Sequence, residues 1–244
     1  VRLRLPTYFC APNFAYLMVA DARDAVEAVP GAGRADIVLE DHHASDQINA
    51  GVAGRRGFVG TFPGEATGEL DGLRLVFRRK AFVARQERLA RSLQGTLPIV
   101  AGADLTTPIA YRWKTQLNEN AKAWSAFEPM PEANHNAIEG SLNPRELSDA
   151  LYVVELRDPD EPPELAERYR VVEELLGERA TNRSTVWAEG PSRLARVLNA
   201  VAQGDMVSVY LAILYQTDPT PVTLLAMLKE RLARATGSDP TGAT

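Results

Sequence analysis

The chain has 244 residues, a formal net charge of −5 and a single cysteine, Cys10. This length suffices for one large domain or two small ones, with enough core to fold without disulfides. The acidic balance disfavours nucleic acid as the main partner, because phosphate binding needs a basic face. One cysteine excludes an intrachain disulfide and a cysteine-rich metal site, and it fits a reducing compartment.

No apolar run approaches the ~20 residues of a membrane span, and no charged-then-apolar secretory signal opens the chain. We therefore expect a cytoplasmic protein with no membrane partner. The chain begins with Val1 rather than methionine. Either a valine codon is the start or the protein extends further, and the sequence leaves both open.

The first part of the chain predicts an α/β region. Helical apolar patterns cover residues 13–29 and 80–94, whereas residues 35–39 and 73–77 resemble strands. Glycine is frequent between residues 51 and 72, which predicts a loop.

The next elements alternate strand and helix signals. Residues 97–102 form a short apolar run that ends in glycine, as in a buried strand. Thr107 is a predicted N-cap and Pro108 a first-turn proline of the following helix. We expect one stripe of this helix to face the core: Ile109, Trp113, Leu117, Ala121 and Trp124.

The alternation continues to the end of the chain. We expect strands over residues 151–156 and 184–188. The predicted helices run from residue 162 or 163 to 176, from 192 to 202, from 205 to 214, and from after the Asp218–Pro221 break to 235. Strands alternating with helices predict a doubly wound α/β sandwich, a parallel sheet covered on both faces.

Two polar stretches point to a ligand site. Residues 111–122 read YRWKTQLNENAK, and residues 131–140 read PEANHNAIEG. Asn-His-Asn makes a poor helix interior and a poor strand, and histidine titrates nearest neutrality. A solvated turn is the simpler alternative, but such clusters commonly sit on a loop that faces a ligand.

These stretches resemble the second half of the bifunctional phosphoglucose/phosphomannose isomerases of the sugar isomerase (SIS) superfamily. The ending is also similar to that family: GDMVSVYLAIL at residues 204–214, DPTPV at 218–222, and Leu228-Lys229. The resemblance covers roughly residues 97–232. It implies a SIS domain over 95–236 and an incomplete or divergent first SIS domain over 1–94. After the last predicted helix we expect a frayed tail over 237–244.

The resemblance implies an aldose–ketose isomerase that interconverts fructose 6-phosphate with glucose 6-phosphate or mannose 6-phosphate. Such a reaction needs a base, an acid that opens the sugar ring, and a phosphate cradle. We expect a homodimer that binds a phosphorylated hexose and needs no metal, nucleotide or other cofactor.

The catalytic candidates are His135 for proton transfer at the ring oxygen, Lys229 in the last helix, and Glu139 as the base. The substrate-binding candidates are Asn134, Asn136, Arg112 and Glu119.

The chain departs from the family pattern where a glutamate usually follows Asn-His-Asn, because Ala137 stands there. If the segment is extended, Glu139 projects to the same side as residue 137 and can replace the missing carboxylate. A solvent-facing Glu139 is the alternative.

The first ninety residues lack the Ser/Thr-rich phosphate loop that the resemblance predicts. Thr61 and Thr67, with Gly60, Gly64 and Gly68, are candidates for a substitute anion-binding turn. Together with Ala137, this absence favours a second hypothesis, a catalytically silent SIS module that binds a sugar phosphate as a sensor or scaffold.

His42-His43 invites a metal interpretation, but the chain supplies only one more histidine, His135. A polar turn is the preferred interpretation of the pair, with contact to a partner subunit's site as the alternative. Metal-ligand spacings of Cys and His, a dinucleotide fingerprint and a Walker loop are all missing.

Overall fold

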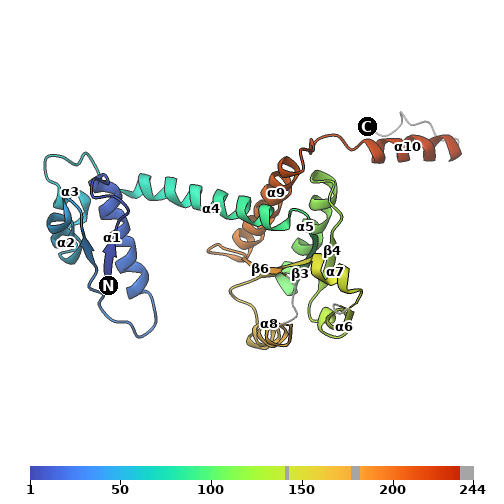
Figure 1. The fold of residues 1–244 in the computed structure, drawn as a ribbon, viewed down its shortest axis with the longest axis horizontal. Helices are drawn as coiled ribbons and strands as arrows, with labels where there is room; N and C mark the ends of the chain where they lie inside the picture. Colours follow the sequence, from blue (N-terminus) through green and yellow to red (C-terminus); the bar gives the residue numbers. More distant parts are fainter. Residues whose placement is uncertain (141–142, 177–181, 237–244) are drawn as a thin grey trace. The chain divides into compact units, whose positions relative to one another are not determined.

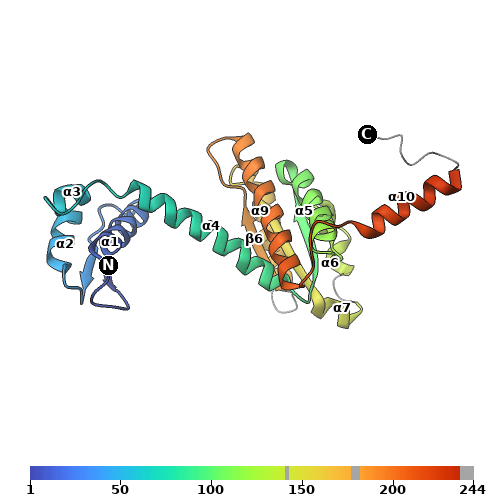
Figure 2. The same cartoon turned by 90° about the horizontal axis from the view of Figure 1, so that it is seen from above.

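The computed structural model describes residues 1–140, 143–176 and 182–236. The chain divides into two compact units, Val1–Phe82 and Val83–Thr244, and the division falls inside one long helix, α4 (Asp71–Leu93) (Figures 1 and 2). Residue 94, at which the sequence suggested a domain boundary, directly follows the end of this helix, and that boundary stays a prediction. The predicted frayed tail lies outside the described residues.

The first unit is a small α/β assembly. Its elements are β1 (Arg2–Arg4), α1 (Pro12–Glu27), β2 (Val38–Glu40), α2 (Ser45–Ala53), α3 (Gly57–Thr61) and the start of α4. β1 and β2 pair in parallel, with Leu3 opposite Leu39. Val19, Leu39 and Ile48 are almost fully buried between α1, β2 and α2. The helix predicted from residue 13 is confirmed.

The strand predicted at residues 73–77 is wrong, because this segment is part of α4. Leu73 packs on the core of the first unit, but Leu75, Val76 and Phe77 are each more than 40% exposed. A short apolar run fits either element, and only its continuation into a long helical segment decides between them.

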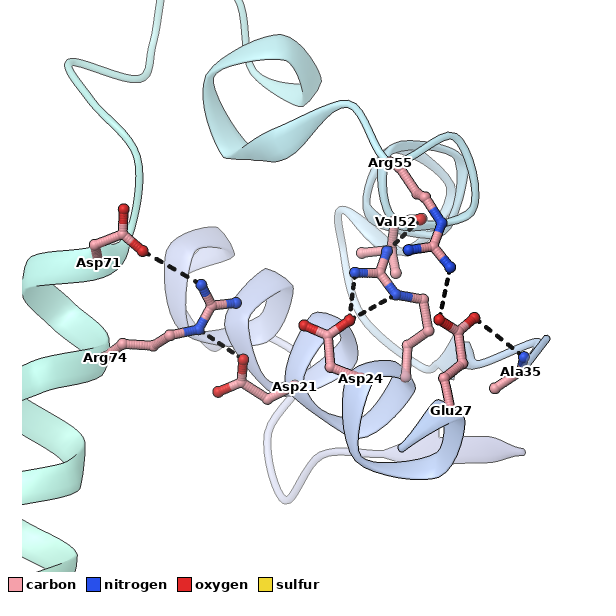
Figure 3. A network of polar contacts seen from close by, with 9 residues as sticks. Asp21, Asp24, Glu27, Ala35, Val52, Arg55, Asp71 and Arg74 are labelled. Carbon is pink, nitrogen blue, oxygen red and sulfur yellow. Dashed lines mark hydrogen bonds and ion pairs between the residues drawn. The ribbon is translucent and has the colours of Figure 1, made fainter. Parts of the chain in front are cut away.

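Arginine–carboxylate pairs join the elements of the first unit (Figure 3). Arg55, just after α2, donates to Glu27 at the end of α1 at 2.6 Å. That hydrogen bond is the largest influence on the pKa of Glu27 and lowers it. In α4, Arg74 bonds Asp21 of α1 at 2.7 Å and lies 3.5 Å from Asp71. Exposed ion pairs of this kind add little to the free energy of unfolding.

His42 lies in the turn before α2, as the polar-turn interpretation expected, but its side chain is only 3% exposed. Its Nε2 lies 2.7 Å from the Cys10 carbonyl oxygen, and its Nδ1 accepts from the Ala44 N–H at 3.1 Å. The ring therefore donates through Nε2 and accepts through Nδ1. These two hydrogen bonds connect the loop that precedes α2 to the backbone at Cys10.

The second unit is built on a parallel sheet whose strand order is β4-β3-β5-β6. The strands are β3 (Leu97–Gly102), β4 (Ala126–Pro129), β5 (Leu151–Arg157) and β6 (Asn182–Trp187). The helices are the end of α4, α5 (Thr107–Asn120), α6 (Ala137–Gly140), α7 (Arg145–Ala150), α8 (Pro163–Leu176), α9 (Arg193–Leu214) and α10 (Thr223–Thr236). The chain steps from β3 to β4 at one edge and then crosses back to β5 on the other side of β3, so the direction of the strand order reverses between β3 and β5.

The two faces of this sheet carry different side chains because strand residues alternate. Val100, Val154 and Val186 join the main core under α4, α5 and α9. Ala101 belongs instead to a smaller cluster with Tyr169 of α8. Figure 1 shows α5 and α9 on one side of the strands and α8 on the other. The doubly wound α/β fold is therefore confirmed, including the strands predicted at 97–102, 151–156 and 184–188.

Two details of α5 differ from the prediction. The helix begins at Thr107, so its N-cap is Thr106 rather than Thr107. Trp124 lies beyond the helix and is 79% exposed, whereas Trp113 and Leu117 are buried in the core. The helical stripe ends with the helix, and spacing alone did not locate that end.

α9 is one continuous helix, not two, although Gly204 lies within it. By length and composition α9 suffices to cross a membrane, but Ala200, Val207 and Leu211 are buried against the sheet and α5. The Trp113 indole donates to the Ala200 carbonyl at 2.8 Å. A Cβ at position 204 would lie 2.3 Å from the Trp113 Nε1 atom. Gly204 therefore leaves the space that the Trp113 indole fills.

Replacing Gly204 with Ala should lower the free energy of unfolding, because the added methyl must displace the buried Trp113 ring. Overpacking of a tight core typically costs about 1–3 kcal/mol. Urea unfolding followed by tryptophan fluorescence measures the loss, since all three tryptophans lie in the second unit. The matched control is Gly140→Ala, where a Cβ meets nothing within 4 Å. Equal stability of the two variants would contradict the packing argument.

Candidate functional site

The Asn-His-Asn motif lies where β4 ends, at the carboxyl edge of the sheet. A short 3-10 helix, η2 (Glu132–Asn134), follows the strand, and α6 begins at Ala137. The Met130 N–H donates to the Gly102 carbonyl at 2.9 Å, which joins the start of this segment to the end of β3. Ligands of open α/β folds bind in the crevice beyond this edge. The loop position predicted for the motif is therefore confirmed.

The segment that carries the motif, residues 132–140, is called the motif segment. One of its sides faces inward. Ala133, Asn134, Ala137 and Ile138 line a cavity of about 290 Å³ beneath the segment. Its floor is the face of the sheet opposite the main core, and α8 closes one side. The remaining lining residues are Ile99, Ala101, Glu128, Met130, Gly140, Leu151, Val153, Glu155, Val172, Leu176 and Arg183.

The other side of the segment faces outward. His135, Asn136 and Glu139 are exposed. Because Ala137–Gly140 is helical, residues 137 and 139 point about 200° apart rather than to one side. The extended geometry under which Glu139 would replace a carboxylate at 137 is therefore not the one observed. Ala137 points into the cavity, whereas Glu139 is not among the residues that line it.

Glu155 and Arg183 are cavity residues that sequence reasoning missed. The Glu155 side chain is 10% exposed and that of Arg183 17%, and Oε1 of the first lies 3.9 Å from Nη1 of the second. Burial is the largest influence on the pKa of Glu155 and raises it, and the positive charges of Arg183 and Arg157 oppose the rise. A glutamate inside an otherwise apolar strand was the signal that could have revealed it.

The candidates on α5 lie on the other side of the sheet from this cavity. Arg112 makes two hydrogen bonds to Asp205 of α9, at 2.9 and 3.0 Å. Glu119 is exposed near the end of the helix, and its backbone carbonyl accepts from Lys122 at 2.6 Å. Because α5 packs on the main-core face, one copy of the chain does not bring Arg112 or Glu119 to the cavity.

Lys229 lies on α10. None of the residues of this helix, all of which the structure describes, is buried. Leu224 is 82% exposed and Leu228 52%. Lys229 is therefore not a lining residue of the cavity under the motif.

Thr61 is not available to the substitute anion turn that the sequence suggested. Thr61 ends α3, is only 5% exposed, and donates its hydroxyl to the Gly57 carbonyl at 2.6 Å. Its side chain fills the space beside Gly51, where a Cβ would lie 2.1 Å from its Oγ1. The hydroxyl is therefore used in a hydrogen bond within α3, and the side chain packs α3 against α2.

Ion pairs of the largely buried Arg157 and Arg196 hold the loops at the carboxyl edge of β5 and β6. Arg196, near the start of α9, lies 2.9 Å from Asp158 and 2.7 Å from Asp160. The Arg157 guanidinium pairs with Glu161 and stacks 3.9 Å from the centre of the Tyr169 ring. In the described ranges, no group of three or more His, Cys, Asp or Glu side chains is placed to hold a metal ion.

A family model settles the kind of domain. Residues 82–232 match the bacterial phospho-glucose isomerase C-terminal SIS domain. The chain belongs to this family. The match begins at the division between the two units, inside α4. It confirms the family resemblance that was inferred from the motif segment, from α5 and from the C-terminal stretches at residues 204–214, 218–222 and 228–229.

Curated relatives give the same result. A bifunctional phosphoglucose/phosphomannose isomerase of Caldicellulosiruptor bescii is 38% identical over 148 residues, which is 60% of this chain and 44% of that protein. One from Aquifex aeolicus is 35% identical, over 61% of this chain and 46% of its own. The chain thus spans less than half the length of these relatives.

A solved structure, described as a glucose-6-phosphate isomerase like protein from Thermus thermophilus, is 25% identical. The similarity has a TM-score of 0.49 and covers 92% of this chain and 77% of that one.

Replacing Glu155 with Gln tests the electrostatics of the cavity. A carboxyl whose pKa is raised on folding stabilises the fold below its unfolded pKa, and this contribution is lost as pH rises through the folded pKa. Glutamine does not titrate. The unfolding free energy of the wild type, relative to Glu155→Gln, should therefore fall as the pH rises from about 4 to about 7. Urea titrations across that range measure the difference, with the exposed Glu139→Gln as control. A rise with pH would contradict the assignment.

Proposed function

We propose that the protein is a sugar-phosphate isomerase of the cytoplasm that interconverts fructose 6-phosphate with glucose 6-phosphate or mannose 6-phosphate. The observation that carries this proposal is membership of the phosphoglucose isomerase SIS family over residues 82–232, with Asn134-His135-Asn136 at the carboxyl edge of the sheet. The reaction is the one named in relatives such as that of Caldicellulosiruptor bescii, of which the match covers 44%.

The chemistry needs few groups. A carboxylate takes a proton from one of two adjacent carbons of the opened sugar and returns it to the other through an enediol-like intermediate. We assign ring-oxygen proton transfer to the exposed His135 and keep Glu139 as the candidate base, with Lys229 completing the set. Asn134, Asn136, Arg112 and Glu119 serve as substrate contacts.

The arrangement of these residues supports a homodimer. The motif segment packs beside Ala101 on one face of the sheet, whereas Arg112 and Glu119 are on α5, which covers the other face. A single site that uses both sets needs two copies of the chain. Closed two-fold dimers supply such shared sites without any new element.

Two observations favour the silent sugar-phosphate module as the second function. Ala137, which takes the place of the family's usual glutamate, points into an apolar cavity, and Glu139 points elsewhere. In the first unit, the Thr61 hydroxyl is committed to Gly57. Binding of fructose 6-phosphate without isomerisation would select this function.

Replacing Glu139 with Gln should lower kcat by ~10²–10⁴-fold if its carboxylate is the base, because the amide keeps size and hydrogen bonding but accepts no proton. A coupled assay with fructose 6-phosphate measures the loss. Glu119→Gln is the matched control and should mainly raise KM. If Glu119→Gln loses turnover and Glu139→Gln does not, the base role passes to Glu119.

The shared site can be tested with mixed dimers. Assayed at a fructose 6-phosphate concentration well below the KM of either variant, His135→Ala and Glu119→Gln homodimers should each lose most activity, the first through kcat and the second through its raised KM. When the two variants are co-expressed with different tags, about half of the dimers contain one chain of each kind. One of the two sites in such a mixed dimer is complete, so the total activity should return to about a quarter of the wild type. Restoration that fails in purified mixed dimers would contradict a site built from two copies, as would light scattering that shows only monomer.

A further inference from the structure

The cavity beneath the motif segment has mostly apolar walls, with Glu155 and Arg183 at one corner and Glu128 elsewhere in its lining. Ile99, Val153, Val172 and Leu176 form most of the floor and the α8 side. Glu155 and Arg183 lie on neighbouring strands, where residue 183 is in register with Val153. A volume of about 290 Å³ holds a small organic molecule, and a few convergent polar groups in an apolar pocket are typical of ligand sites.

Arg183 is incompletely paired in this corner. Its Nε and Nη1 are buried and have no hydrogen-bond partner among the described residues. The Glu155 oxygen at 3.9 Å is beyond hydrogen-bonding distance. A buried guanidinium with unsatisfied N–H groups costs free energy that an acceptor in the cavity would recover.

We propose that this cavity binds a small apolar monocarboxylate, with its carboxylate on Arg183 and its hydrocarbon body against Val153, Val172 and Leu176. Guanidinium–carboxylate hydrogen bonds are among the strong charge-assisted ones. A phosphate dianion fits less well, because Glu128 and Glu155 line the same cavity and only one arginine faces them. The ligand is distinct from the hexose phosphate of the proposed reaction.

The cavity can accept a ligand with a single negative charge because the neutral form of Glu155 does not repel it. Burial favours its neutral acid by raising its pKa, and a neutral carboxylic acid donates a hydrogen bond to a bound carboxylate. The ligand would also touch Ala137 and Asn134, which flank His135 in sequence. Occupancy should therefore change the surroundings of His135, one of only three histidines in the chain.

The test uses hexanoate, with hexanamide as the neutral isostere, and needs no sugar phosphate. Calorimetry should show hexanoate binding, with hexanamide at least about tenfold weaker, a loss of about 1.4 kcal/mol. Proton NMR should show one histidine Hε1 signal shifting with hexanoate, and His135→Gln should remove that signal.

Variants separate the parts of the site. Arg183→Met should abolish hexanoate binding, whereas Glu155→Gln should keep it, because the amide still donates a hydrogen bond. Ala137→Leu fills the cavity without changing a charge and should also abolish binding, which covers the case in which Arg183→Met does not fold. Equal affinity for hexanamide, or hexanoate binding that survives Ala137→Leu, would overturn the proposal, as would no binding at about 10 mM. None of these outcomes depends on isomerase activity.

Discussion

The close approach of α5 and α9 at Trp113 and Gly204 is the constraint on which the second unit depends. Trp113 occupies the place of a Cβ at position 204 and donates to the Ala200 carbonyl. With both helices seated on the main-core face, the connection from β5 to β6 through α8 takes the opposite face. Right-handed crossovers enforce this division, because a sheet whose strand order reverses sends its helices to opposite sides.

The division separates two environments around the motif segment. Its outward side chains, His135, Asn136 and Glu139, are polar and exposed. Its inward side chains close an apolar cavity over Glu155 and Arg183. The short helix α6 produces this separation, because helical residues two apart point to nearly opposite sides. One segment therefore presents a polar surface on one side and an apolar surface on the other.

The first unit stands apart from the family match, which begins at residue 82. It has a core of its own around Val19, Leu39 and Ile48, and histidine and asparagine side chains finish its backbone hydrogen bonds. Asn49, for example, donates to the Leu39 carbonyl and accepts from its N–H, as a neighbouring strand would. Polar residues in this region thus support the fold, which explains why neither His42 nor Thr61 is available for ligand chemistry.

The sequence by itself determined the doubly wound fold, the family, and the loop that carries Asn134-His135-Asn136, because apolar periodicity and dense motifs are local properties of the chain. It misassigned residues 73–77 and divided α9 at Gly204, because short apolar runs and single glycines have no fixed meaning without their packing partners. Only the tertiary structure decided which way each loop residue points. It turned Ala137 inward and Glu139 outward. It also placed α5 on the opposite face of the sheet from the motif, and brought the side chains of Glu155 and Arg183 close together on neighbouring strands. Those relations depend on helix phase and strand register, which long-range contacts fix and local sequence does not.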